Sequence, residues 1–295
     1  MDEAVATAVS TMADETALSE IAFFGGSFTA INREYMEQLL QSAYKHVKNG
    51  IVKGIRVSTR PDAINDEILA VLSRYGVTTI ELGAQSMLDS VLVANHRGHT
   101  ADDVRTAARL IKERGFNLGL QMMTGLYTDT DEGAVYTASE FIALQPDFVR
   151  IYPTVVLEGT LLADYYRSGK YKPQTVDEAV EICVKLLEMF YRENIPVIRL
   201  GLHAVDESEF VGGAWHPSFG ELCESRIMLG RIKEITEKGK SYIISVSPRN
   251  VSKAIGNRRK NIIALKTEGI LIKVVADSSL GDSEISAKEV NEDET

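Results

Sequence analysis

Polar side chains suited to binding a small ligand recur where the apolar runs of this sequence end. Ser58 and Arg60 close one run, and Gln85 follows the next. Gln121 interrupts a third run, and Arg97 precedes a helical segment, where a guanidinium can hold a carboxylate through two hydrogen bonds. Together these hydroxyl, amide and guanidinium groups predict a ligand that carries amine, carboxylate and hydroxyl groups.

A pair of glycines follows the first apolar run. Gly25 and Gly26 come directly after residues 21–24 and before Ser27. Glycines leave main-chain N–H and C=O groups uncovered, so a ligand can contact the backbone directly. Taken alone, the pair is more typical of a tight turn. Neither the GxGxxG nor the GxxxxGKS/T nucleotide signature is present.

The apolar runs are predicted to be strands of one parallel sheet. Helical segments with apolar residues three and four apart separate them, an alternation typical of βα units. Such units form either a barrel or a doubly wound sheet, and right-handed crossovers place all strand ends on one rim. Ligand-binding residues of these folds lie past the carboxyl ends of the strands. The six predicted strands cover residues 21–24, 55–58, 78–83, 118–123, 148–154 and 197–202.

Two more residues of this rim are candidates for contact with a substrate. Tyr152 alternates with apolar residues in the fifth strand, as Arg150 does, which indicates that both face the interior or the mouth of a barrel. His203 follows the sixth strand. Glu81 is the one rim carboxylate that fits a general acid or base, which leaves a conventional barrel lyase or isomerase as a weaker hypothesis.

Composition and charge limit the class of protein. The 295 residues are 44% hydrophobic and 25% charged, close to globular averages. The net charge of −10 argues against broad, nonspecific attraction to nucleic acid. One basic run, Arg258-Arg259-Lys260, could still contact RNA, although a solvated turn is the simpler interpretation. No apolar run could cross a bilayer and the first residues are acidic rather than basic, so we expect a cytoplasmic protein without membrane attachment.

The pattern divides the chain into three parts. Residues 1–216 hold the βα units, and residues 217–276 are predicted to form a small α+β appendage. Residues 277–295 carry seven acids against one lysine and are expected to be a disordered acidic tail. The appendage is predicted to be β-rich at residues 242–246, 261–266 and 270–275.

Four segments carry a resemblance to a known family. IAFFGGSFTAI, IRVSTRPD, IELGAQSMLDSVLVANHRGHT and LQMMTGLYTDT resemble successive segments of radical S-adenosylmethionine (SAM) enzymes. The branch of the elongator catalytic subunit and its short bacterial relatives is the most similar, and oxygen-independent coproporphyrinogen III oxidase is more distantly similar. The resemblance covers roughly residues 21–226. It implies an α/β fold of the partial (β/α) barrel type.

The resemblance also implies how the rim would hold the methionyl part of SAM. Gly25, Gly26 and Ser27 match the motif whose backbone holds the methionyl amino group. Ser58 and Arg60 lie at a strand end that contacts the same amino-acid moiety in the family.

Three further positions match contacts with the rest of the cofactor. Gln85 matches a position that contacts the ribose, and Arg97 matches the arginine that pairs with the methionyl carboxylate. Gln121 stands where a more distant relative binds the ribose through an aspartate. The amide keeps the capacity for hydrogen bonds but loses the charge.

One motif of the family is absent. Radical SAM enzymes hold a 4Fe-4S cluster on CxxxCxxC after their first strand, whereas Cys183 and Cys223 are the only cysteines here, and helical spacing predicts that both are core thiols. A helix predicted over residues 2–12 also precedes the first strand, whereas a βα barrel begins with a strand. Loss of an N-terminal unit with its strand and cysteines explains both features. We therefore expect this chain alone to be inactive.

For the complete enzyme, the resemblance implies reductive cleavage of SAM to a 5′-deoxyadenosyl radical, which abstracts hydrogen from a substrate. The electron donor would be a flavodoxin or ferredoxin, and the elongator likeness favours tRNA as substrate. The alternative from the same residues is a clusterless protein that binds SAM without catalysis.

Overall fold

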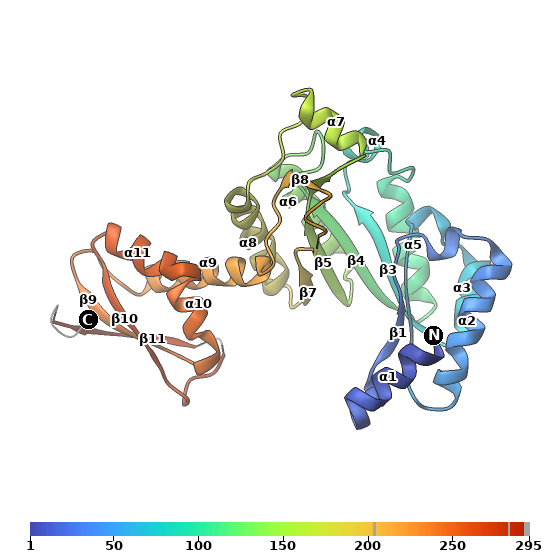
Figure 1. Cartoon of the computed structure of the whole chain (residues 1–295), viewed down its shortest axis with the longest axis horizontal. Helices are drawn as coiled ribbons and strands as arrows, with labels where there is room; N and C mark the ends of the chain where they lie inside the picture. Colours follow the sequence, from blue (N-terminus) through green and yellow to red (C-terminus); the bar gives the residue numbers. More distant parts are fainter. Residues whose placement is uncertain (203–204, 283, 292–295) are drawn as a thin grey trace. The chain divides into compact units, whose positions relative to one another are not determined.

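The computed structural model (Figure 1) describes residues 1–202, 205–282 and 284–291. Contacts between residues divide the chain into two compact units. The first unit consists of Met1–Thr154 and Leu186–Leu200, and the second of Val155–Lys185 and Gly201–Thr295. Within the described residues, no helix combines the length and apolar character needed to cross a membrane.

A curled sheet of six parallel strands forms the centre of the first unit (Figure 1). The strands follow the order β1-β2-β3-β4-β5-β7, so each is added beside its predecessor on the same side. A doubly wound sheet reverses its order at a switch point, whereas this order is that of a half barrel. The predicted α/β partial barrel is confirmed. The strands are β1 (Glu20–Phe23), β2 (Gly54–Thr59), β3 (Val77–Gln85), β4 (Asn117–Thr124), β5 (Phe148–Pro153) and β7 (Val197–Leu200).

Helices connect these strands, and polar caps fix where several of them begin. The side chain of Asn32 accepts a hydrogen bond from the Tyr35 N–H at the start of one helix. Thr100 and Asp103 form a capping box at the start of another, which satisfies N–H groups that lack partners inside the helix. The helices are α1 (Asp2–Met12), α2 (Arg33–Lys48), α3 (Asp66–Arg74), α4 (Asp89–Ala94), α5 (Ala101–Glu113), α6 (Asp131–Leu144) and α8 (Val176–Arg192), which the two units share.

The alternation of side chains along each strand gives this sheet two different faces. Ile55, Val57 and Leu82 belong to an apolar face that is fully buried against the connecting helices. Arg56 and Glu81 alternate with them and therefore lie on the opposite, concave face. The half barrel thus carries charged groups on the surface that a polar ligand would meet.

The second unit contains two small sheets. β6 (Val155–Leu157) pairs antiparallel with β8 (Phe210–Gly213). Both strands belong to the second unit, whereas the sequence pattern places the domain boundary at residue 216. In the other sheet, β9 (Ser241–Val246) lies between the parallel β10 (Leu271–Ala276) and the antiparallel β11 (Ile285–Val290). The helices of this unit are α7 (Leu161–Arg167), α9 (Phe219–Glu234), α10 (Val251–Ile255) and α11 (Lys260–Thr267).

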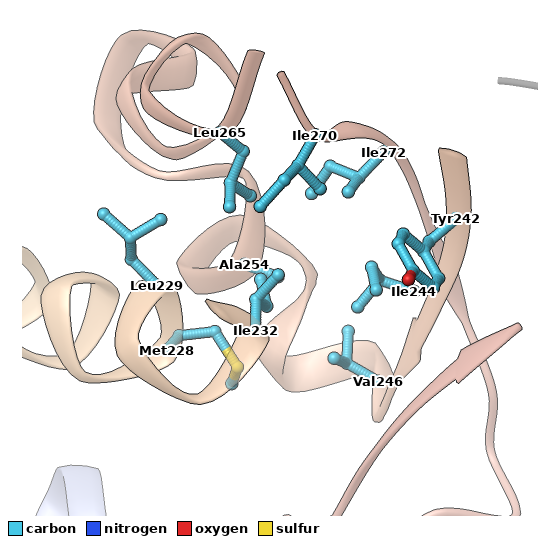
Figure 2. Close-up of a cluster of buried hydrophobic side chains, with 10 residues drawn as sticks. All are labelled: Met228, Leu229, Ile232, Tyr242, Ile244, Val246, Ala254, Leu265, Ile270 and Ile272. Atoms are coloured by element: carbon cyan, nitrogen blue, oxygen red, sulfur yellow. The ribbon is translucent and has the colours of Figure 1, made fainter. Parts of the chain in front are cut away.

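Helices α9, α10 and α11 pack with the three-stranded sheet around a hydrophobic core of their own (Figure 2). Ile232 from α9, Leu265 from α11 and Ile244 from β9 are all fully buried in it. Apolar burial therefore stabilises this C-terminal segment.

The β-rich interpretation of residues 261–266 is wrong, because these residues lie in α11. Leu265 is fully buried, whereas 59% of Ile263 is exposed. In a strand these two side chains would share a face, while a helix places them on different sides. A short apolar run cannot be assigned to a strand or a helix from its periodicity alone.

The expectation of a disordered tail also fails for residues 285–290. They form β11, which pairs with β9 over its whole length. Ile285 and Ala287 pack against the core, and Lys288 and Glu289 are exposed. The sequence pattern did not indicate this strand, because the acidic residues outnumber the two alternating apolar residues.

The helical assignment of residues 260–267 predicts unequal effects of two alanine substitutions. Leu265→Ala should lower the free energy of unfolding by about 2–5 kcal/mol, since it leaves a cavity in the core. Ile263→Ala should change it by less than about 0.5 kcal/mol, because the side chain is mostly in solvent. Denaturant unfolding of both variants measures the difference, and equal losses would contradict the helix.

Candidate functional site

A buried carboxylate occupies the middle of the concave face. Glu81 on β3 accepts hydrogen bonds from Arg56 Nη1 on β2 at 2.8 Å. Gln121 Nε2 on β4 donates to it at 2.9 Å, and Arg150 Nε and Nη2 on β5 donate at 2.8 and 3.1 Å. Both oxygens are thus saturated, and one side chain ties together four neighbouring strands. The predicted interior position of Arg150 is confirmed.

A second carboxylate extends this network to the first strand. Glu20 on β1 accepts a hydrogen bond from Arg56 Nη2 at 2.6 Å. It also accepts hydrogen bonds from the hydroxyls of Thr78 and Thr79 at 2.7 and 2.8 Å. Burial alone would raise the pKa of Glu20, but these hydrogen bonds outweigh it and lower the pKa below its ordinary value. Both ends of the Arg56 guanidinium therefore face carboxylates, and its own pKa is raised against the effect of burial by Glu81 and Glu20.

A glycine makes room for this network. A Cβ on Gly119 would lie 2.4 Å from the ring of Phe148 and 3.0 Å from Cγ of Glu81. The Arg56 guanidinium lies 4.7 Å from the centre of the same Phe148 ring. Gly119 on β4 therefore leaves space for the side chains of Glu81 on β3 and Phe148 on β5.

Two of the predicted ligand-binding residues belong to the network. Gln121 Nε2 donates to Ser58 Oγ at 3.1 Å as well as to Glu81, and Ser58 is buried. Tyr152 follows Arg150 by two residues on β5 and is half-buried on the same concave face. The structure thus brings Ser58, Gln121 and Tyr152 to one surface of the sheet.

The glycine turn lies at the carboxyl end of β1. Gly25 and Gly26 have φ values of +132° and +75°, which side chains rarely tolerate, and no atom lies within 4 Å of where a Cβ would stand. Their backbone groups are therefore open to a ligand. Phe24, next to them, lies 5.4 Å from the Arg150 guanidinium and is mostly exposed.

Arg97 is held in the turn between α4 and α5 and reaches the carboxyl end of β4. Its Nη2 lies 3.2 Å from Met123 Sδ, and its buried Nε has no hydrogen-bond partner among the described residues. Burial lowers the pKa of the guanidinium. A buried cation whose donor lacks an acceptor is costly unless an anion binds it.

The remaining predicted residues differ in their surroundings. Gln85 has a positive φ of +66°, and its Nε2 would lie 2.9 Å from a Cβ on Gly83, so that glycine leaves space for it. Arg60 is paired with Asp62 at 2.6 Å in a partly exposed position, so its charge is already matched. His203 lies outside the described residues.

The residues present do not fit an iron–sulfur cluster. No group of three or more histidine, cysteine or acidic side chains could hold a metal ion in the described ranges. Cys183 and Cys223 are both fully buried, as predicted, and their thiols contact each other. The hydrogen bond between the thiols, together with burial, raises the pKa of Cys223 and keeps it protonated.

Sequence reasoning found the rim but missed the network beneath it. Glu20 was overlooked, although it stands at the first position of an apolar strand, where a carboxylate is unusual. Arg56 and Glu81 each interrupt an apolar strand in the same way. Charged residues at alternate positions of successive parallel strands are the signal that could have revealed the network.

Two family models match this half-barrel sequence and the segment that follows it. The Radical SAM superfamily model matches residues 2–140, and the Radical SAM C-terminal domain model matches residues 146–228. The chain belongs to the radical SAM superfamily, as its resemblance implies. Membership implies SAM and a 4Fe-4S cluster as the cofactors of the family.

Among curated proteins, the chain is similar to Elongator complex protein 3 of Homo sapiens. The two are 30% identical over 190 residues, which cover 58% of this chain and 35% of the relative. It is also 27% identical over 186 residues to the tRNA uridine(34) acetyltransferase of Methanocaldococcus infernus, covering 55% of this chain and 34% of that protein. The chain therefore spans about a third of the length of these relatives.

Among solved structures, the archaeal Methanocaldococcus infernus Elp3 with an N-terminal deletion superposes with a TM-score of 0.67. The match covers 80% of this chain and 60% of that chain at 21% sequence identity. At this identity the likeness supports the fold.

The buried network predicts a large effect of one neutralised carboxylate. Glu81→Gln removes the buried counter-ion that the half-buried Arg56 and Arg150 share and should lower the free energy of unfolding by about 3–5 kcal/mol. The matched control is Glu113→Gln, which breaks an exposed pair with Arg109 and should cost less than about 1 kcal/mol. Chemical denaturation measures both. Equal effects would show that the network does not hold the strands together.

Proposed function

We propose that this chain forms the SAM-binding part of a radical SAM enzyme that modifies tRNA. The observation that carries the proposal is the half-buried side chain of Arg97, whose buried Nε lacks a partner in the described structure. A methionyl carboxylate would supply the missing acceptor and charge. Family membership identifies SAM as the molecule that carries it.

The other rim residues would divide the remaining contacts with SAM. The open backbone of Gly25 and Gly26, with Ser27, would receive the methionyl amino group. Gln85 and Gln121 would hydrogen-bond the ribose.

Two rim residues already have hydrogen-bond partners in the protein, and two others would face the substrate. Ser58 would contact the amino-acid moiety beside Gln121. Arg60 would contact SAM only by giving up its ion pair with Asp62. Tyr152 and His203 would face the substrate.

In this family, SAM bound beside a reduced cluster supplies a 5′-deoxyadenosyl radical. The contribution of the present residues would be to bind SAM, orient it and exclude water from the concave face. The cluster ligands would come from sequence outside these 295 residues, and a flavodoxin or ferredoxin would donate the electron. Similarity to the archaeal tRNA uridine(34) acetyltransferase supports tRNA as the substrate class.

One observation supports the second candidate, a clusterless protein that binds SAM without catalysis. Among the described side chains no group suits a metal ion, and only two cysteines exist. A conventional lyase or isomerase is less well supported, because Glu81 already accepts four hydrogen bonds and is not free to move a proton.

The genomic sequence upstream of the Met1 codon separates the two candidates. The radical SAM proposal predicts an in-frame CxxxCxxC segment there. An open reading frame that extends upstream without this motif would contradict the proposal and leave the clusterless protein.

Calorimetry with SAM tests the site itself. Arg97→Gln should weaken SAM binding at least about tenfold, because it removes a charge-assisted hydrogen bond to the carboxylate. Arg109→Gln on the exposed side of α5 removes the same charge and should leave the affinity unchanged. A wild-type chain that does not bind SAM, or an Arg97 variant that binds as tightly as wild type, would contradict the assignment.

A further inference from the structure

The segment after residue 228 lies beyond both family models and has its own core and its own charge pattern. Between Ser247 and Asn261 the chain carries five basic residues and no acidic one, although the whole protein has a net charge of −10. The basic residues are Arg249, Lys253, Arg258, Arg259 and Lys260. A positive surface of this density attracts polyanions at short range.

These residues surround a tight loop between two helices. Gly256, Arg258 and Arg259 join α10 to α11 with φ values of +79°, +51° and +63°. Positive φ is uncommon for residues other than glycine and costs conformational energy. Two successive arginines thus share the left-handed backbone conformation of the loop.

A buried asparagine fixes that conformation. Asn261 Nδ2 donates to Ser225 O on α9 at 2.9 Å and to Lys253 O on α10 at 3.0 Å. A Cβ on Gly256 would lie 2.9 Å from the Asn261 backbone nitrogen, so only glycine permits this close approach. The loop is therefore built onto α9 and α10 before any ligand arrives.

The loop forms one wall of a groove of about 500 Å³. Arg249, Lys253, Arg258 and Arg259 line it, and Glu221 is the single acid among its lining residues. Arg249 pairs weakly with Asp282 at 3.5 Å, and Lys253 pairs with Glu224.

The two arginines at the tip differ from the other cations of the groove. Arg258 and Arg259 are exposed and form no ion pair with any residue in the described ranges. Their charges are therefore available to an incoming ligand.

We propose that this groove binds the phosphodiester backbone of single-stranded RNA. The unit β9-α10-loop-α11-β10 places a short glycine-led loop between two helices on a sheet, the arrangement with which KH modules clamp an RNA backbone. Here Arg258 and Arg259 follow Gly256 and Asn257 and offer guanidinium groups to phosphates. The groove lining contains no aromatic residue for base stacking, so binding should tolerate any sequence. The proposal does not depend on the SAM site of the first unit.

Fluorescence anisotropy of the full chain with a labelled oligouridylate of about twelve nucleotides tests the proposal. Arg258→Ala/Arg259→Ala should weaken binding at least about tenfold and reduce the slope of log affinity against log salt by about 1.4, the value for two lost phosphate contacts on a single strand. Lys238→Ala/Lys288→Ala removes the same charge from exposed positions outside the groove and should leave affinity and slope unchanged. Circular dichroism and SAM calorimetry should match wild type for both variants.

Three outcomes would overturn the proposal. The wild-type chain could fail to bind the RNA at about 50 mM salt, where phosphate contacts are strongest. The two double variants could lose affinity equally, which would indicate general charge attraction. Polyglutamate could compete as well as unlabelled RNA, which would indicate a site for acidic polypeptides instead. Loss of SAM binding with intact RNA binding would reject the proposed function and leave this inference standing.

Discussion

The concave face of the half barrel depends on one buried carboxylate. Glu81 is fully buried, and the hydrogen bonds of Arg56, Gln121 and Arg150 meet on its two oxygens. Either arginine alone would be costly to bury, but the shared carboxylate and the second acid, Glu20, balance the two positive charges. Four parallel strands consequently carry polar side chains on a face that would otherwise have to be apolar.

This constraint connects the fold to the proposed chemistry. The helices cover only the apolar face of the sheet, while the network keeps the concave face charged and ordered. The ligand-binding candidates Ser58 and Gln121 lie on that ordered surface because Gln121 bonds both Ser58 and Glu81. Arg97 reaches the carboxyl end of β4 from the turn between α4 and α5. Its Nε has no hydrogen-bond acceptor among the described residues. A pre-organised surface with one unmatched cation is what a small zwitterionic ligand requires.

Much of this arrangement could be predicted from the sequence, since it follows from local patterns. Alternating apolar runs and amphipathic helices give the parallel sheet, and strand-end glycines and polar residues give its rim. The network could not be predicted, because it depends on which residues of different strands stand side by side, and register is not encoded in any one strand. The contact between Cys183 on α8 and Cys223 on α9 could not be predicted either, because it depends on how two helices pack against each other.

The errors lie in the C-terminal segment, where competing patterns were weak. Residues 261–266 are apolar enough for a strand, yet Leu265 is buried in the core and Ile262 and Ala264 pack against it, while Ile263 is mostly exposed. The acidic composition after residue 277 outweighed the two apolar side chains, Ile285 and Ala287, that fix β11 on the sheet. In both places burial against distant residues decided the structure.

The central claim is that the unmatched Arg97 guanidinium and the open glycine turn form one SAM site. A crystal structure of the chain with S-adenosylmethionine tests it most directly. The account predicts the methionyl carboxylate on Arg97 and the amino group at the backbone of Gly25 and Gly26. A ligand bound elsewhere, or Arg97 matched by a residue of the protein in its presence, would contradict it.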